Sequence, residues 1–143
     1  MQRCPTVFDV FGTLTEEALA LLASGLEFSD KVKPIALPPN GEELPEGTHD
    51  VVSNVLREAD LTIVNNEECQ KKVEEPVTKR MICATGGKTR KDTCKFDSGG
   101  PLEHNGTLVG IVSWGRGCGI KNMPGVYTNI ARLRNWIQQH TGV

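Results

Sequence analysis

The chain has 143 residues and a mass of 15.6 kDa, the usual length of a single domain. Apolar residues make up 38% and charged residues 24%, a balance typical of a folded domain rather than a disordered chain. The formal net charge of −2 offers no bulk positive potential for nucleic acid or an anionic membrane surface. No apolar run approaches the roughly 18 residues that a membrane span needs. The 15 glycines and 8 prolines favour many turns and short strands, and therefore an all-β chain.

The first half of the chain contains few regular patterns. Thr15–Glu17 can begin a short helix, and residues 29–48, rich in Pro, Gly and charge, predict an extended surface connection. Apolar and polar residues alternate near the end of residues 56–64, which predicts a strand with one buried face. Asn65 is suited to cap a short helix that runs toward Val73. Residues 85–100, rich in Gly, Lys and Asp, predict loops.

The second half carries the clearest local signal, the dipeptide Asn105–Gly106 between two β-type runs. Asn-Gly predicts a tight hairpin because both turn residues need positive φ. Residues 125–128 predict a further strand, and a helix capped by Asn129 closes the chain. Its apolar face is expected to consist of Ile130, Leu133, Trp136 and Ile137.

The five cysteines indicate disulfides rather than a metal site. None lies in a Cys-x-x-Cys pair, so a zinc ribbon or a thioredoxin-type site is not suggested. Wide spacing in a chain rich in Gly and Pro favours disulfides formed in an oxidising compartment. The N-terminus shows no convincing signal peptide, which suggests an incomplete or altered start. The cysteines are Cys4, Cys69, Cys83, Cys94 and Cys118.

One segment, residues 92–102, carries possible catalytic chemistry. Ser98 is followed by two glycines, which would let a substrate backbone approach a serine nucleophile, and neighbouring N–H groups can converge on an oxyanion. Most Ser-Gly-Gly segments are only turns, so this segment alone is a weak signal.

Three segments in fixed order and spacing, Asp97–Pro101, Ser113–Gly115 and Pro124–Tyr127, resemble the trypsin-like (chymotrypsin-fold, S1 family) serine proteases. The resemblance is strong over 56–143, continues through 26–39, and corresponds to about the C-terminal half of a family domain. It implies an all-β fold: an antiparallel Greek-key barrel, the second of the family's two, incomplete at a strand edge, with a C-terminal α-helix. We therefore expect a divergent N-terminal segment, 1–25, and a partial protease domain, 26–143.

The resemblance implies a secreted endopeptidase that cleaves after Arg or Lys and has no cofactor or metal. Polypeptide substrates or protease inhibitors would be its partners, and a missing N-terminal barrel would be another. Ser98 matches the nucleophile, and Asp92 matches the carboxylate at the bottom of the specificity pocket, where it would select cationic side chains. Gly115 and Gly125 match the small residues that keep this pocket open. The segment Ser113, Trp114 and Gly115 matches the strand that pairs with substrate backbone.

Structural residues follow from the same resemblance. Asp97 matches the buried aspartate that pairs with a new N-terminus in the mature family enzymes. Two family disulfides fall on Cys69–Cys83 and Cys94–Cys118, which leaves Cys4 without a partner.

The chain departs from the family in its catalytic machinery. The mechanism needs a His and an Asp before the serine in the chain, and His49, in a Gly-Thr-His-Asp segment expected to be a loop, lacks the family's context. No catalytic His is therefore assigned, and Glu16 is only a weak match to the family's Asp. Phe96, whose N–H would form the oxyanion hole with that of Ser98, stands where the family has Gly. We therefore expect the chain to be inactive as given. The alternatives are a pseudoprotease that binds without cutting, or a truncated or mis-predicted fragment of an active protease.

A rival motif lies near the N-terminus. Residues 8–14 resemble the nucleophile segment of haloacid-dehalogenase-like phosphohydrolases, with Asp9 as the nucleophile beside a Mg²⁺. Phe11 stands where the phosphatases have a second aspartate, which fits only the dehalogenase branch. The simpler interpretation is a leader unrelated to either family.

Overall fold

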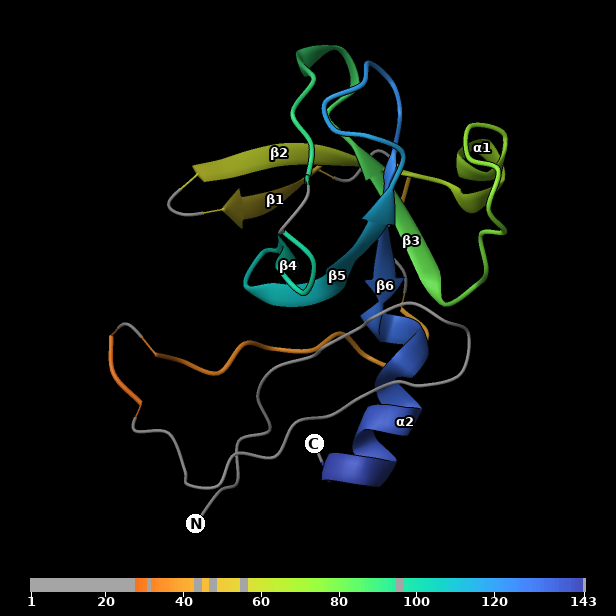
Figure 1. The fold of residues 1–143 in the computed structure, drawn as a ribbon. Helices are drawn as coiled ribbons and strands as arrows, with labels where there is room; N and C mark the ends of the chain where they lie inside the picture. Colours follow the sequence, from red (N-terminus) through yellow and green to blue (C-terminus); the bar gives the residue numbers. More distant parts are fainter. Residues whose placement is uncertain are drawn as a thin grey trace.

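The computed structural model describes residues 28–30, 32–42, 45–46, 49–54, 57–94 and 97–142. Six antiparallel strands form a ring in the order β1-β2-β3-β6-β5-β4, and a C-terminal helix, α2, extends from one end of it (Figure 1). This arrangement confirms the expected all-β fold. The strands are β1 His49–Asn54, β2 Arg57–Val64, β3 Met81–Thr85, β4 Pro101–His104, β5 Thr107–Gly115 and β6 Gly125–Asn129. The helices are α1 Asn66–Gln70, the 3₁₀ helix η1 Gly87–Thr89 and α2 Ile130–Thr141.

The core of the barrel confirms the expected alternation in β2. Leu61 and Ile63 are buried, whereas Asp60 is exposed and Thr62 is half-buried. Burial of such an aliphatic side chain contributes roughly 1.5–3 kcal/mol. The other members of this cluster are Ile82, Ala84, Leu102, Val109, Val112 and Tyr127.

The β4–β5 hairpin forms as the sequence predicts. Asn105 and Gly106 have φ values of 49° and 77°, the left-handed pair that a two-residue hairpin turn requires. Further along β5, Gly110 faces the core. A Cβ placed on Gly110 would lie 3.1–3.3 Å from side-chain atoms of Leu102 and Tyr127, so the barrel interior has no room for a larger residue here.

The two α-helices begin where expected but differ in detail. The Asn65 side chain caps α1 by accepting a hydrogen bond from the Glu68 N–H at 2.8 Å. This helix ends at Gln70 and does not reach Val73. Asn129 does precede α2, but its side chain makes no capping hydrogen bond, because the residue is buried at the end of β6. Along α2, Ile130, Leu133 and Ile137 pack onto β5 residues Leu108 and Ile111, and Trp136 is half-buried beside them.

Two strands are not expected from the sequence. His49, expected in a loop, begins β1, which pairs with β2 from His49↔Thr62 to Asn54↔Arg57. The segment lacks a regular alternation, so only its pairing identifies it as a strand. Strand β3 was not predicted because its sequence is a short, continuous apolar run, and such a run does not distinguish a strand from a helix.

The ring closes through a narrow seam between β1 and β4. A single register pair, Val51↔Glu103, joins these strands, whereas β1 and β2 share six pairs. This seam corresponds to the strand edge at which we expected the barrel to be incomplete.

A strap, residues 32–42, runs past the β4–β5 hairpin toward the start of α2 as the expected extended connection (Figure 1, orange). Ala36 pairs in parallel with Thr107, and its carbonyl accepts a hydrogen bond from the Leu108 N–H at 2.8 Å. Near the other end, the Gly41 N–H donates to the Ala131 carbonyl at 2.9 Å. The possible helix at 15–17 and the motif at 8–14 lie outside the described residues.

Candidate active site

Asp92 is the most unusual carboxylate among the described residues. It follows η1 and is half-buried. Its Oδ2 accepts a hydrogen bond from the Gly119 N–H at 3.0 Å, whereas Oδ1 is buried and has no hydrogen-bond partner among the described residues. Burial raises the pKa of Asp92, although the N–H groups of Gly119 and Thr93 oppose the rise. The site therefore holds a desolvated carboxylate with one unused acceptor.

The two glycines matched to the specificity pocket, Gly115 and Gly125, lie against each other, and Gly125 also lies close to Thr93, the residue after Asp92. A Cβ on Gly125 would lie 3.3 Å from the hydroxyl oxygens of Thr93 and Tyr127, which are themselves 3.1 Å apart. A Cβ on Gly115 would lie 3.6 Å from the Cα of Gly125, so the two glycines face each other. Gly115 and Gly125 are also register partners at the adjoining ends of β5 and β6. A side chain at Gly125 would therefore contact the Thr93 and Tyr127 hydroxyl groups.

Asp92 is held by two loops that are linked to each other. The disulfide Cys94–Cys118 joins the segment after Asp92 to the β5–β6 loop. The Asn122 N–H donates to the Gly87 carbonyl at 3.2 Å, which joins the same two loops a second time. The expected Cys69–Cys83 disulfide is also present and joins α1 to β3. Both expected disulfides are thus confirmed, while Cys4 lies outside the described residues.

The Ser98 loop is fixed to β5 by main-chain hydrogen bonds. The Gly99 N–H donates to the Val112 carbonyl, and the Val112 N–H donates to the Gly100 carbonyl, both at 2.9 Å. The Ser98 side chain is exposed and has no hydrogen-bond partner among the described residues. Its loop is therefore positioned, but no described base is hydrogen-bonded to its hydroxyl.

Asp97 has a local partner instead of a charged one. Its Oδ2 accepts a hydrogen bond from the Cys94 N–H at 2.7 Å, and its own N–H donates to the Cys94 carbonyl at 3.1 Å. Residues 95 and 96 lie outside the described residues, so the role of Phe96 remains a sequence-based prediction. A carboxylate bound in this way is satisfied without an ion pair.

The segment Ser113–Gly115 forms the end of β5. The register between β5 and β6 shifts between Val112 and Trp114, so Ser113 lies at an irregularity in the ladder. Trp114 is half-buried and packs against the cluster that contains Val126 and the Cys69–Cys83 disulfide. Gly115 and Gly125 thus pair at the adjoining ends of β5 and β6, and the Ser98 loop is bonded to β5 at Val112.

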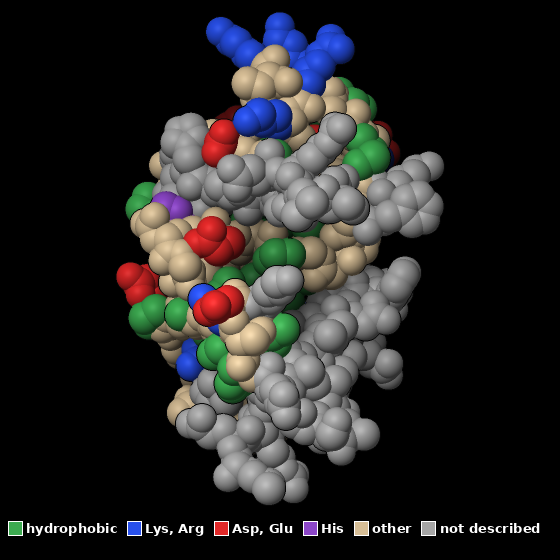
Figure 2. Space-filling model, turned by 90° about the vertical axis from the view of Figure 1, so that its left-hand side faces the viewer, with side chains coloured by type: hydrophobic (Ala, Val, Ile, Leu, Met, Phe, Trp, Pro, Cys, Tyr) green, Lys and Arg blue, Asp and Glu red, His purple; other side chains and the backbone are tan. Residues whose placement is uncertain are grey.

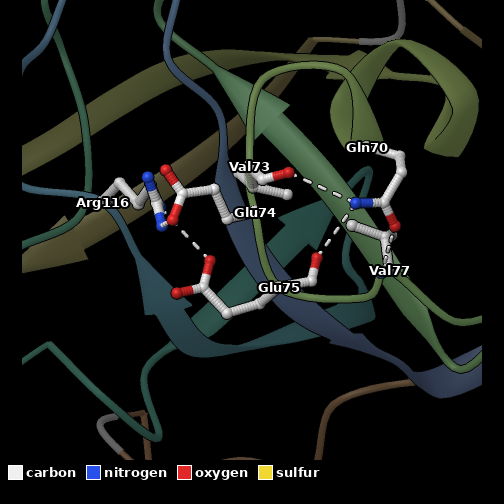
Figure 3. Close-up of polar contacts among 6 residues, drawn as sticks. All are labelled: Gln70, Val73, Glu74, Glu75, Val77 and Arg116. Carbon is white, nitrogen blue, oxygen red and sulfur yellow. Dashed lines mark hydrogen bonds and ion pairs between the residues drawn. The ribbon is translucent and has the colours of Figure 1, made fainter.

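An ion cluster that the sequence did not predict borders this segment. Arg116, next to Gly115, contacts the Glu74 carboxylate at 2.5 Å and the Glu75 carboxylate at 3.2 Å (Figure 3). The two carboxylates raise the pKa of Arg116, and the guanidinium lowers the pKa of each glutamate. Residue separations of 41 and 42 leave no periodic signal by which sequence reading could find the pairs.

The loop that bears these glutamates is braced by one amide side chain. Gln70 donates from Nε2 to the carbonyls of Val73 and Glu75 at 3.2 and 3.1 Å, and its Oε1 accepts from the Val77 N–H at 2.7 Å (Figure 3). The ion cluster therefore connects the end of β5 to a loop whose conformation is stabilised by the hydrogen bonds of Gln70.

No histidine is hydrogen-bonded to Ser98 in the described part of the chain. His140 Nδ1 lies 2.8 Å from the Trp136 carbonyl oxygen, the His104 ring lies beside the Asn105 amide, and the side chain of His49 is outside the description. Glu16 is outside it as well. Across the described residues, no group of three or more His, Cys, Asp or Glu side chains could hold a metal ion. No helix there has the length and apolarity to cross a membrane.

Comparison with known proteins identifies the family. The chain is 39% identical to trypsin 5G1 of Aedes aegypti over 150 aligned positions, which cover 95% of this chain and 56% of that protein. It is 40% identical to trypsin II-P29 of Gallus gallus, covering 89% of this chain and 56% of that protein. The chain thus spans little more than half the length of these relatives.

A solved structure shows the same fold. The structure of neuropsin, a serine protease expressed in the limbic system of mouse brain, matches with a TM-score of 0.75 and 32% identity, covering 85% of this chain and 60% of that one. The trypsin family model matches residues 9–137. On these matches, together with the barrel described above, the chain belongs to the family of trypsin-like serine proteases.

Proposed function

We propose that this chain is the substrate-binding half of a trypsin-like endopeptidase domain that recognises Arg or Lys side chains. The observation that carries the proposal is the buried Asp92 Oδ1, which lacks a partner among the described residues. A buried acceptor of this kind is costly unless a donor reaches it, and an extended cationic side chain would supply both a donor and a compensating charge. Gly115 and Gly125 would leave the space through which it enters.

In the proposed reaction, Ser98 would attack the carbonyl carbon of the bond that follows the bound Arg or Lys. The main-chain N–H groups of Phe96 and Ser98 would stabilise the oxyanion, and the segment Ser113–Gly115 would pair with the substrate backbone. A serine hydroxyl needs a base to remove its proton, and no described residue is hydrogen-bonded to it. We therefore expect the chain by itself to bind cationic side chains but to turn over poorly.

The domain division follows the same reasoning. Residues 26–143 would form the protease part, and 1–25 a divergent segment. The general base would come from a first barrel, supplied by another polypeptide or by a longer form of this one. Disulfides and trypsin-type relatives are compatible with a secreted protein.

A paired assay separates a pseudoprotease from an active enzyme. The purified chain and its Ser98→Ala variant would be incubated with an arginine ester and, separately, with a serine-directed phosphonate. Loss of the serine or histidine of such a triad costs on the order of 10⁶ in turnover, so we expect the two proteins to give equal, background rates. Turnover or labelling well above the Ser98→Ala control would show that a base is supplied and would disprove the hypothesis that the chain is inactive by itself.

A further inference from the structure

The two loops that hold Asp92 also carry a concentration of positive charge on their outer side. We call them the basic loop pair: residues 86–92 and 117–122. They contain Lys88, Arg90, Lys91 and Lys121, all exposed, against the single carboxylate of Asp92. The whole chain is acidic, with 16 Lys and Arg against 18 Asp and Glu. Positive charge is therefore concentrated locally in a protein that is negative overall.

The cations lie together at one end of the molecule. Lys and Arg side chains gather at the top of the space-filling view, the end at which Figure 1 places η1 and the loop between β5 and β6 (Figure 2). Lys88, Arg90 and Lys121 have no ion-pair partner among the described residues, and Lys91 pairs with Asp60 at 3.0 Å. By contrast, the positive charges of the other lysine-rich segment, 71–80, are balanced by nearby carboxylates: Glu74 and Glu75 within the segment, and Glu67 and Glu68 in the preceding helix α1.

The main chain holds these cations in a fixed arrangement. Arg90 and Asn122 have φ values of 58° and 60°, so both backbones are in the left-handed region of tight turns. Gly119 also has positive φ, and a Cβ on it would lie 3.0 Å from the Arg90 carbonyl oxygen. The loops are therefore in direct contact, in addition to the hydrogen bond between Asn122 and Gly87 and the disulfide. Little backbone ordering entropy would therefore be lost when an anionic ligand binds, and the remaining cost would come from the Lys and Arg side chains.

We propose that the basic loop pair binds a linear sulfated polysaccharide. Its cations project from turn tips, a form that suits repeated contacts along a flexible polyanion. Disulfides indicate an oxidising compartment, where sulfated glycans are the common polyanions and nucleic acid is not. Protein–protein interfaces are commonly centred on a buried Trp, Tyr or Arg, whereas neither loop contains an aromatic residue and Arg90 is exposed. This inference does not depend on Ser98 or on the proposed cleavage.

The experiment uses heparin as the probe and the full chain as the analyte. Each cation contact with a polyanion releases bound counterions, so three contacts predict a roughly 30-fold loss of affinity between 50 and 200 mM NaCl. The triple variant Lys88→Gln, Arg90→Gln, Lys121→Gln should lose retention on immobilised heparin. The control variant Lys33→Gln, Lys72→Gln, Lys79→Gln has the same net charge and should elute like the wild type. Thermal melting of both variants shows that the fold is kept.

Several results would overturn the proposal. Equal loss in both triple variants would show a bulk-charge effect, and no retention at 50 mM NaCl would show no site. Tighter binding to a poly-glutamate peptide than to heparin would favour an acidic protein partner instead. Asp92→Asn should leave heparin binding intact, so failure of the pocket and failure of this surface are distinguishable.

Discussion

Replacing Asp92 by Asn would separate binding at the pocket from stability of the fold. Asn has nearly the same shape and keeps an acceptor for the Gly119 N–H, which donates at 3.0 Å, but it removes the charge. A hydrogen bond to a charged group contributes about 1.5–3 kcal/mol, and removing one partner of a buried charge pair costs roughly 2–5 kcal/mol. We therefore expect Asp92→Asn to weaken the binding of an amidinium ligand such as benzamidine by about 3 kcal/mol, which is about a 150-fold increase in Kd.

The same change should not weaken the fold. Burial raises the pKa of Asp92, so the folded state holds this proton more tightly than the unfolded state does. The ordinary pKa of an aspartate is 3.8. As the pH rises from that value through the raised pKa of folded Asp92, ionisation of the carboxyl group lowers the free energy of unfolding, and this penalty persists at neutral pH. Asn carries no such penalty. At pH 7 the melting temperature of Asp92→Asn should equal or exceed that of the wild type, and the difference should vanish below the ordinary pKa.

Benzamidine binding is measured by titration of tryptophan fluorescence, which Trp114 reports from the end of β5. Asp30→Asn, at an exposed carboxylate outside the two loops that hold Asp92, is the matched control for the change in net charge and should bind like the wild type. Binding to the wild type should also weaken as the pH falls through the raised pKa, because the protonated carboxyl no longer attracts a cation. Unchanged affinity in Asp92→Asn, or a clear loss of its stability at pH 7, would refute this reasoning.

Four further outcomes are expected. Asn65→Ala removes the cap of α1 and should lower the free energy of unfolding by about 1 kcal/mol in urea titrations; an unchanged midpoint would show that the cap is not needed. Gly110→Ala should destabilise by about 1–3 kcal/mol, because its Cβ would crowd Leu102 and Tyr127, and calorimetry that finds no decrease would mean that the core adjusts freely. Cys4 should be a free thiol in non-reducing peptide maps, and any bridge to it would disprove the pairing. Residues 28, 32 and 35 place exposed Phe, Val and Ile on one segment; their combined replacement by Ser should reduce binding of a hydrophobic dye more than Ile120→Ser does.

Local signals allowed much of the fold to be predicted. The Asn105–Gly106 turn, the alternation in β2 and the apolar face of α2 all depend on neighbours within a few residues, so a sequence shows them directly. β1 was missed because its pairing with β2 identifies it, and no internal period does. Asn129 stands at the expected position without its expected bond, because burial at the end of β6 overrides the local capping preference.

Prediction of the site divides in the same way. Asp92, Ser98, Gly115 and Gly125 were predicted from family motifs; the structure adds an Asp92 Oδ1 with no partner among the described residues and the close approach of the two glycines. The pairs of Arg116 with Glu74 and Glu75 were missed, because tertiary structure alone brings together residues more than 40 positions apart. The hydrogen bond from the Cys94 N–H to Asp97 was not predicted either, because the family motif concerns a charged partner of this aspartate and not a nearby main-chain donor.

Because β1 and β4 meet at a narrow seam, strand pairing is not equally extensive around the barrel. Local opening takes the least costly path, and one register pair at this seam compares with six between β1 and β2. Opening there would leave two strand edges with unpaired N–H and C=O groups, which can pair with the edges of a second opened molecule. We therefore expect any self-association in concentrated solution to begin at this seam, through main-chain pairing that involves neither the pocket nor the basic loop pair.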